Sequence, residues 1–403
     1  MNSNILNVLE KPLFDNAIVN FEKRSHGPYS ATNLNNNDEI RIPIQQQDTY
    51  TAPYYSLLYI RGRLCKADGT VSATAKFDRM GILLLFDEIR YELNGIPVDR
   101  SRNPGLTTIM KNYVSISQNE SLKLENAGWI ISDHFTDAEG NFDVCIPLRI
   151  CMGFGEDFQK IIVNLRQELV LIRGSTDTNA IVGVAGDDEG LRVQLQSVSW
   201  KVPHVSVADA ERLKLLKYID RNVELAVPFR SWELHEYPLL TETRTHTWSI
   251  KTSSQLEKPR FIIFGFQVAR KNKIDKAMSQ FDHCNLTNFK VFLNSDSYPY
   301  DNLNVDFSKN CYAILYDMYA QFQQSYYQKD SEPFLTTYTY KHMAPLVVVD
   351  CSCQNEVLKS GTVDIRLEFG TNDNIPKETA AYCLIIHDRI VYYNPLTSIV
   401  RTY

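Results

Sequence analysis

The chain has 403 residues, of which 44% are hydrophobic and 11% aromatic, and its formal net charge is −6. This length exceeds what one hydrophobic core usually organises, so it predicts about two domains of roughly 200 residues each. The acidic balance, with no basic run longer than "RKNK" at Arg270–Lys273, argues against a protein that binds nucleic acid directly.

The amino-terminal residues lack a basic start followed by an apolar stretch, so they do not resemble a signal peptide. The longest aliphatic-aromatic run, Ile82–Phe86, is far shorter than the ~20 residues that span a bilayer. We therefore expect a protein made in the cytoplasm that is neither secreted nor transmembrane. Its cysteines are scattered and are expected to be reduced, small buried residues: Cys65, Cys145, Cys151, Cys284, Cys311, Cys351, Cys353 and Cys383.

Residues 1–38 end in a polar, Asn-rich segment without periodicity, which predicts an amino-terminal arm. Strands are then expected at Ile40–Gln45, at Tyr55–Lys66 and along Gly81–Gly95. In the last of these, apolar and polar residues alternate over "IRYELN", the period of a half-buried strand. The following Asn94-Gly95 pair supplies the positive φ angles of a tight hairpin turn.

The rest of the first half predicts a helix at Asn103–Ile116, a loop to Trp129, and strands at 141–150, 163–174 and 191–202. The intervening "GEDFQKII" is expected to form a helical turn. Residues 204–224 then predict a helical linker, with Ser206 as its cap. The buried stripe of this helix is expected to comprise Leu213, Leu216 and Ile219.

The second half repeats the pattern of short strands, with one long helix at Tyr312–Tyr327. At an offset of 200 residues, Leu93 and Asn94 align with Leu293 and Asn294. The same offset superposes "VNLRQEL" on "VDIRLEF", so that Val163, Arg166 and Glu168 align with Val363, Arg366 and Glu368. Two places that agree on one offset, with the order of elements preserved, indicate an internal duplication.

Each half contains some eight short strands, with helices confined to the connections, which is typical of antiparallel sandwiches or barrels. Too few helices are present for parallel βαβ winding. We therefore predict an all-β protein of two consecutive eight-stranded antiparallel jelly rolls, at residues 39–203 and 225–403, joined by the helical linker.

Several blocks resemble a particular family. They are "FDEIRYELNG", "KLENAGW", "FRSWELHEYPLL", "WSIKTSSQLEKPRFIIFGFQ", "FDHCNL" and "NCYAILYDMYAQFQQSYY". Together they resemble double jelly-roll proteins encoded in insect and other invertebrate genomes. That family is similar to the major capsid proteins of Polinton (Maverick) elements, adintoviruses and virophages. The resemblance extends from about Asp38 to Tyr393.

The resemblance implies a virion building block that forms homotrimers, in which six similar domains fit a six-neighbour icosahedral lattice. It implies contacts with further trimers and with penton or other minor capsid proteins, and assembly in the cytoplasm or the nucleus. The loops Cys65–Phe77, Gly174–Gly190 and Gly370–Ala380 are expected at domain ends. Contact of the amino-terminal arm with an internal partner or a membrane stays open, although packing of the arm on a neighbouring chain is favoured.

Other functions compete with this one. An enzyme is not expected, because His246 has no second His two residues away and no nucleophile, zinc or phosphate-loop motif is present. "GFGEDF" at Gly153–Phe158 lacks the Lys of a phosphate loop. No catalytic, cofactor-binding or metal-binding residue is therefore predicted, and no cofactor. A tandem carbohydrate- or protein-binding module, and a host-domesticated assembly protein outside a virion, remain as alternatives.

Overall fold

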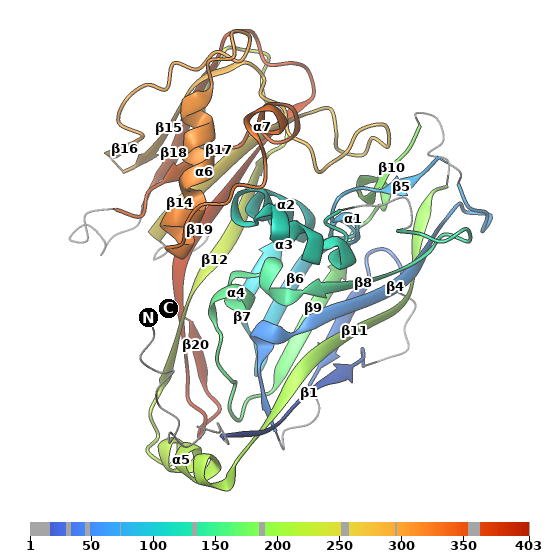
Figure 1. The fold of residues 1–403 in the computed structure, drawn as a ribbon, viewed down its shortest axis with the longest axis vertical. Coiled ribbons are helices and arrows are strands. Elements are labelled where there is room, and N and C mark those ends of the chain that lie inside the picture. The colour runs from blue at the N-terminus through green and yellow to red at the C-terminus, as the bar shows by residue number, and fades with distance from the viewer. Residues whose placement is uncertain are drawn as a thin grey trace, which may run out of the picture.

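The computed structural model describes residues 17–29, 34–44, 49–72, 74–130, 135–184, 190–250, 258–294, 296–353 and 363–402. Two β-sandwiches lie side by side and are joined at the base of the molecule by one helix (Figure 1). None of the helices in this described part combines the length and apolarity that a membrane crossing needs. Most of the expected amino-terminal arm, residues 1–16 and 30–33, lies outside the described residues.

The first sandwich has two antiparallel sheets. One has the order β1 (Ile18–His26), β11 (Arg192–Val207), β4 (Leu57–Cys65) and β8 (Asn141–Pro147), and β3 (Tyr50–Thr51) also pairs with β11. The other has the order β2 (Glu39–Pro43), β9 (Gln167–Arg173), β6 (Phe86–Leu93) and β7 (Ile96–Arg102).

The second sandwich is built in the same way. Its first sheet has the order β12 (Leu225–Tyr237), β19 (Thr379–Tyr393), β14 (Lys258–Val268) and β17 (Val347–Asp350), and β20 (Val400–Thr402) also pairs with β19. Its second sheet has the order β13 (Thr245–Ile250), β18 (Ile365–Thr371), β15 (Leu286–Leu293) and β16 (Asp296–Tyr298).

The two sandwiches share one topology. In each, the first, eighth, third and sixth main strands form one sheet, and the second, seventh, fourth and fifth form the other. This is the jelly-roll arrangement, and the predicted fold class is confirmed. The long connection between the fifth and sixth strands is helical in both halves. It carries α2 (Pro104–Ser115) and α3 (Gln118–Lys123) in the first, and α6 (Ala313–Tyr327) and α7 (Thr337–Met343) in the second.

The first strand of the first jelly roll lies within the segment expected to be an arm, so that expectation is wrong for residues 18–26. Strand β1 pairs with β11 from Ile18↔Val207 to His26↔Trp200. The first six of its nine residues are all exposed. The alternation of buried and exposed residues that marks a half-buried strand is therefore absent. An edge strand with little burial leaves no periodic signal in its sequence.

Other differences concern short helices. The apolar run expected as the start of a strand forms α1 (Gly81–Leu84) before β6 begins, because a short apolar run fits a buried helical turn equally well. The loop expected before Trp129 contains α3, closed by a capping box between Ser117 and Glu120. The turn expected near Gly153 is present as α4 (Gly153–Asp157).

The linker helix is present as α5 (Asp209–Ile219), but its predicted cap and packing are wrong. Ser206 belongs to β11, and Ala208 occupies the position before the helix without a side-chain cap. None of the residues of α5 is buried, and Leu213 is 58% exposed. The helix lies at the end of the molecule away from both cores (Figure 1), and Ile219 is only half-buried, so the helix has no buried stripe.

The internal repeat is visible in the hairpin that follows β6 and β15. Asn94 and Asn294 both adopt positive φ, at 50° and 55°. In each hairpin, one residue near the start of the neighbouring strand makes two hydrogen bonds with the Asn. The backbone N–H of the Asn donates to the carbonyl of that residue, and Oδ1 of the Asn accepts from its N–H. Asn94 binds Arg166 at 2.9 Å in both bonds, and Asn294 binds Asp364 at 3.0 and 2.9 Å.

The sequence alignment of the partner strands is shifted, however. Leu93 faces Gln167, whereas Leu293 faces Ile365. The structural equivalence of β9 and β18 therefore falls two residues short of the offset of 200. The predicted alignment of Arg166 with Arg366, and those of the Val and Glu residues on either side, are therefore wrong. A shift of two residues keeps each side chain on the same face of its strand, because side chains alternate with a period of two.

The loops expected at domain ends connect the ends of strands. The connections at Cys65–Phe77 and Gly174–Gly190 leave the ends of β4 and β9 and meet where β5 (Lys76–Phe77) pairs with β10 (Ile181–Val182). The connection Gly174–Gly190 is not exposed along its whole length, because Ala180 and Ile181 are buried. Residues 73 and 185–189 lie outside the described residues. Gly370–Ala380 joins β18 to β19.

Two histidines hold β1 against β11. Nε2 of His26 lies 3.0 Å from Nε2 of His204, and Nδ1 of His204 lies 2.6 Å from Oγ1 of Thr49. Burial, followed by His26 and Arg24, lowers the pKa of His204 to about 4 from its ordinary 6.5. Burial also lowers the pKa of His26. The hydrogen bond between His26 and His204 requires at least one neutral imidazole ring, because one of the two Nε2 atoms must accept it.

We expect the protein to lose stability as the pH falls from about 6.5 toward 4. The unfolded chain then binds a proton at residue 204 that the folded chain does not bind, so the free energy of unfolding decreases. Thermal unfolding at about pH 7.5 and about pH 5 measures this loss. The variant His204→Gln keeps hydrogen-bonding capacity and should show a smaller loss. An identical pH dependence in the variant would contradict the assignment.

Candidate functional site: the junction between the two jelly rolls

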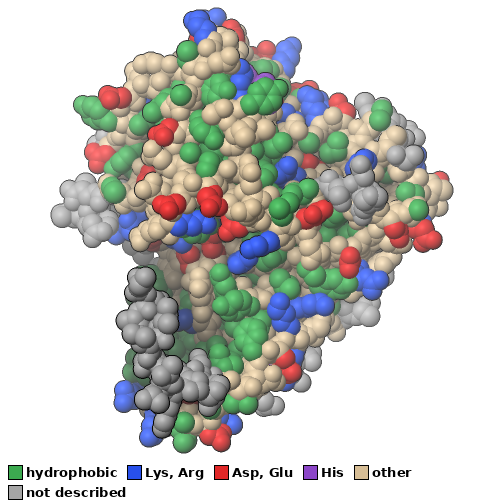
Figure 2. All heavy atoms as spheres, viewed as in Figure 1, with side chains coloured by type: hydrophobic (Ala, Val, Ile, Leu, Met, Phe, Trp, Pro, Cys, Tyr) green, Lys and Arg blue, Asp and Glu red, His purple; other side chains and the backbone are tan. Residues whose placement is uncertain are grey.

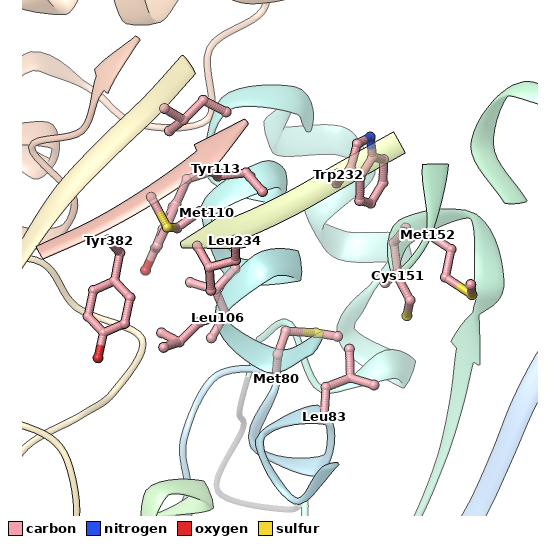
Figure 3. Packing of buried hydrophobic residues seen from close by; sticks show 14 of the residues in the cluster. Met80, Leu83, Leu106, Met110, Tyr113, Cys151, Met152, Trp232, Leu234 and Tyr382 are labelled. Atoms are coloured by element: carbon pink, nitrogen blue, oxygen red, sulfur yellow. The ribbon is translucent and has the colours of Figure 1, made fainter. Parts of the chain in front are cut away.

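The junction is organised around α2, all twelve residues of which are buried. The helix is packed between its own sandwich and strands β12 and β19 of the second one. Figure 3 shows Leu106, Met110 and Tyr113 of α2 beside Leu234 of β12 and Tyr382 of β19. Because these side chains join one hydrophobic cluster, the two jelly rolls share a continuous core.

The backbones of the two halves approach closely where α4 begins. A Cβ built on Gly153 would lie 1.6 Å from the carbonyl oxygen of Arg230 in β12. Any residue other than glycine at this position would have to displace the backbone of α4 or of β12. Gly153 belongs to the segment that resembles a glycine loop in the sequence, and its role here is to allow contact between the jelly rolls.

A buried carboxylate ties three elements together beside this contact. Asp99 of β7 is 2% exposed. Its Oδ2 accepts from the N–H of Phe154 in α4, and its Oδ1 accepts from Oγ of Ser231 in β12, both at 2.9 Å. The hydrogen bonds offset the cost of removing the carboxylate from water and hold β7, α4 and β12 in register.

A second buried carboxylate crosses the junction near α1. Asp78 accepts from the N–H of Ser279 at 2.7 Å and from its Oγ at 2.6 Å. The hydroxyl of Tyr113 donates to the carbonyl of the same residue at 2.9 Å. Burial raises the pKa of Asp78, so this contact is one in which desolvation opposes the charged form.

A buried lysine forms the centre of the third contact. Lys111 of α2 is 1% exposed, and its Nζ donates to Oγ of Ser115 at 2.8 Å, to Oε1 of Glu156 at 3.2 Å and to the hydroxyl of Tyr327 at 3.0 Å. It also lies 4.3 Å from the ring centroid of Tyr326. Burial lowers the pKa of Lys111, while Glu156 opposes that change.

Glu156 and the neighbouring Asp157 complete this network from α4. Oε2 of Glu156 accepts from the hydroxyl of Tyr326 at 2.6 Å. Asp157 accepts from Nε of Arg230 at 2.8 Å and from Nη2 at 2.5 Å, a two-point ion pair. Arg230 also covers the ring of Tyr326, with its Cζ 3.5 Å from the centroid. Charged groups of α2, α4 and β12 thus interlock across the junction with two tyrosines of α6.

The sequence did not point to these residues. Asp78, Asp99, Lys111 and Glu156 lie in unrelated segments, and only the fold brings them together. One signal was present for Lys111, since it is the single charged residue in the sequence of α2. Such a residue, if the helix is buried, must have partners.

The remaining residues considered for chemistry are dispersed. None of the eight cysteines, all of which lie in the described ranges, forms a disulfide bond. The expectation that they are buried is wrong for Cys311 and Cys353, which are exposed, and Cys145 and Cys284 are half-buried. Three tryptophans are buried, at 129, 200 and 232. Within the described ranges no three His, Cys, Asp or Glu side chains are grouped so that they could hold a metal ion.

Two jelly rolls of identical strand order, locked into one core within a single chain, define a double jelly-roll protein. A family model described as a double jelly roll-like domain matches residues 77–391. The chain therefore belongs to the double jelly roll-like domain family. None of the curated proteins matches it in sequence.

Solved structures share the fold over nearly the whole chain. PBCV-1 VP54, fitted into a reconstruction of the virophage Sputnik, has a TM-score of 0.63 at 9% identity and covers 97% of this chain and 98% of its own. A chain of the Sputnik virophage particle has a TM-score of 0.63 at 10% identity, covering 98% and 91%. The mavirus major capsid protein has a TM-score of 0.57 at 11% identity, covering 99% and 92%. Identities this low show similarity of fold.

We predict that Gly153→Ala severely destabilises the protein. The added methyl group would overlap the carbonyl of Arg230, and relief requires movement of α4 or β12. The expected loss is about 3 kcal/mol or more in the free energy of unfolding, measured by denaturant titration. Gly27→Ala is the matched control, because a Cβ at that position would have nothing within 4 Å. Equal stability of the two variants would contradict the close approach.

Lys111→Met should also destabilise the protein, by about 3 kcal/mol, because it leaves Glu156 without its buried cation. Adding Glu156→Gln removes the uncompensated charge and should restore part of the loss. A double-mutant cycle measured by chemical unfolding gives the coupling energy, which we expect at about 1–3 kcal/mol. Strictly additive effects of the two substitutions would show that the charges are not coupled.

Proposed function

We propose that the protein is a major capsid protein of viral type, which forms pseudo-hexagonal homotrimers that tile an icosahedral shell. The observation that carries this proposal is the repetition of one eight-stranded topology twice in a single chain. Three such chains related by three-fold symmetry present six similar domains around one axis, which suits a lattice of six neighbours. The family match and the likeness to virophage and mavirus capsid structures support the same function.

The shared core strengthens this proposal. A tile must keep its two jelly rolls at one fixed angle, since any hinge between them would change the outline of the trimer. The buried α2 and the contacts of Asp78, Asp99 and Lys111 join the halves into one body. A tandem binding module has no such requirement, because two binding domains act equally well on a flexible linker.

An exposed apolar edge offers a surface for self-association. On β1, Ile18 is 53% exposed, Val19 69% and Phe21 47%. The strand forms the edge of its sheet, and exposed apolar edge strands are aggregation-prone unless another chain covers them. We assign this edge to a contact between subunits of the trimer.

The role is a structural one, without catalysis or a cofactor, and the protein functions in the virion. Penton and other minor capsid proteins would be its further partners. A tandem carbohydrate- or protein-binding module is the second candidate, and a domesticated copy with an assembly role outside a virion is the third. A carbohydrate array separates the binding module from the capsid protein, for which we expect trimers and no sugar binding.

The native mass of the purified protein, together with negative-stain images, tests the proposal. We expect a trimer with a pseudo-hexagonal outline. Val19→Lys should weaken the association at least about tenfold, because a charge replaces an apolar side chain in the buried contact. Val184→Lys is the matched control, since Val184 is similarly exposed, at 58%, but lies in the connection between β9 and β11.

A monomer at high concentration would overturn the capsid function as a whole. A stable trimer that tolerates Val19→Lys as well as Val184→Lys would leave that function intact and refute the assignment of β1 to the subunit contact.

A further inference from the structure

A cavity of about 400 Å³ opens beside the junction, and its walls come from both jelly rolls. The first jelly roll contributes Lys123 at the end of α3 and Arg149 beyond β8, while the second contributes Tyr327 and Lys329. Figure 2 shows basic and acidic side chains gathered on this face near the lower end of α6. The volume lies within the range of pockets that hold small organic molecules.

The charges around the cavity are not balanced internally. Its three half-buried carboxylates already have cationic partners: Glu156 is paired with Lys111, Asp157 with Arg230, and Glu120 with Lys329, whose Nζ lies 3.8 Å away. By contrast, neither Lys123 nor Arg149 forms an ion pair with any residue in the described part of the chain.

Arg149 contacts a tyrosine instead of a carboxylate. One of its guanidinium nitrogens lies 3.4 Å from the hydroxyl of Tyr54, and its Cζ lies 5.8 Å from the centroid of the same ring. A tyrosine ring does not neutralise a guanidinium. Two cations of the wall, Lys123 and Arg149, therefore have no anionic partner among the described residues.

Buried donors on the same wall also lack acceptors. Asn112 lines the cavity and is 2% exposed, and its Nδ2 has no hydrogen-bond partner among the described residues. The same holds for Nε1 of Trp232, which is also a lining residue. A buried donor without an acceptor costs free energy. These two donors are sealed from water, whereas Lys123 and Arg149 face it, so a ligand rich in acceptor oxygens would supply the partner that the two cations lack.

We propose that this cavity binds a small organic oxyanion, held through a carboxylate or phosphate group by Lys123 and Arg149. The guanidinium of Arg149 suits either group because it can donate two parallel hydrogen bonds. Tyr54 and Tyr327 supply aromatic surface for the rest of the molecule. Since the walls belong to both jelly rolls, the bound ligand stabilises their junction. The site is independent of the capsid role.

Thermal unfolding and titration calorimetry of the full chain test this site with two probes, citrate for the carboxylate and adenosine monophosphate for the phosphate. Sodium chloride at equal ionic strength is the reference. We expect at least one probe to raise the melting temperature by about 2 °C or more at saturating concentration. The probe that binds more tightly identifies the type of oxyanion.

The double variant Lys123→Gln/Arg149→Gln should bind that probe at least about tenfold more weakly, because it loses two charge-assisted contacts. The matched control is Lys377→Gln/Arg61→Gln, which removes the same charge at two positions outside the cavity lining. Quenching of tryptophan fluorescence gives a second readout, since Trp232 lines the cavity.

Two results would overturn the proposal. One is the absence of binding by either probe up to about 10 mM, a concentration that would reveal even a weak site. The other is equal loss of binding in both double variants, which would indicate a general effect of net charge. Neither result bears on trimer formation, so failure of this site is distinguishable from failure of the capsid role.

Discussion

The arrangement of the whole molecule depends on the burial of α2. A helix that exposes no face to water has to be enclosed on all sides, and one sandwich can cover only part of it. The second sandwich supplies the remaining cover through β12 and β19, beside Leu106 and Met110 (Figure 3). Separation of the jelly rolls would expose this apolar surface to water, so its burial stabilises the two halves as a pair.

Apolar contact alone does not set the angle between two sandwiches, because it is non-directional. The polar contacts supply the direction. Asp99 requires Phe154 and Ser231 at fixed positions, and Asp78 requires Ser279. Each of these groups is costly to bury without its partner. A rotated arrangement would leave several buried charges unpaired at once, so the network selects one arrangement of those that hydrophobic burial would allow.

Sequence reasoning reached the architecture but not the junction. Alternating strands such as Ile89–Leu93, the Asn94-Gly95 turn and the element order carried the jelly-roll prediction, because these signals are local. It missed β1, whose exposed residues leave no periodicity, and it overlooked the capping box at Ser117. The contacts of Asp78 and Lys111 join residues far apart in the chain, and no local pattern encodes such pairs. A single sequence therefore indicates each jelly roll better than the way in which two of them fit together.

The two jelly rolls share a topology but differ in their environment. Helix α2 is wholly buried, while its counterpart α6 has only five buried residues and keeps a face toward the surface. The first strand of one jelly roll, β1, is an exposed edge, while its counterpart β12 packs against α2 and α4. The two units thus have one backbone plan and different surfaces. In the three-fold assembly proposed above, such a chain would present two kinds of edge in alternation. This alternation would give a six-sided tile a defined set of neighbours, which six identical jelly rolls would not have.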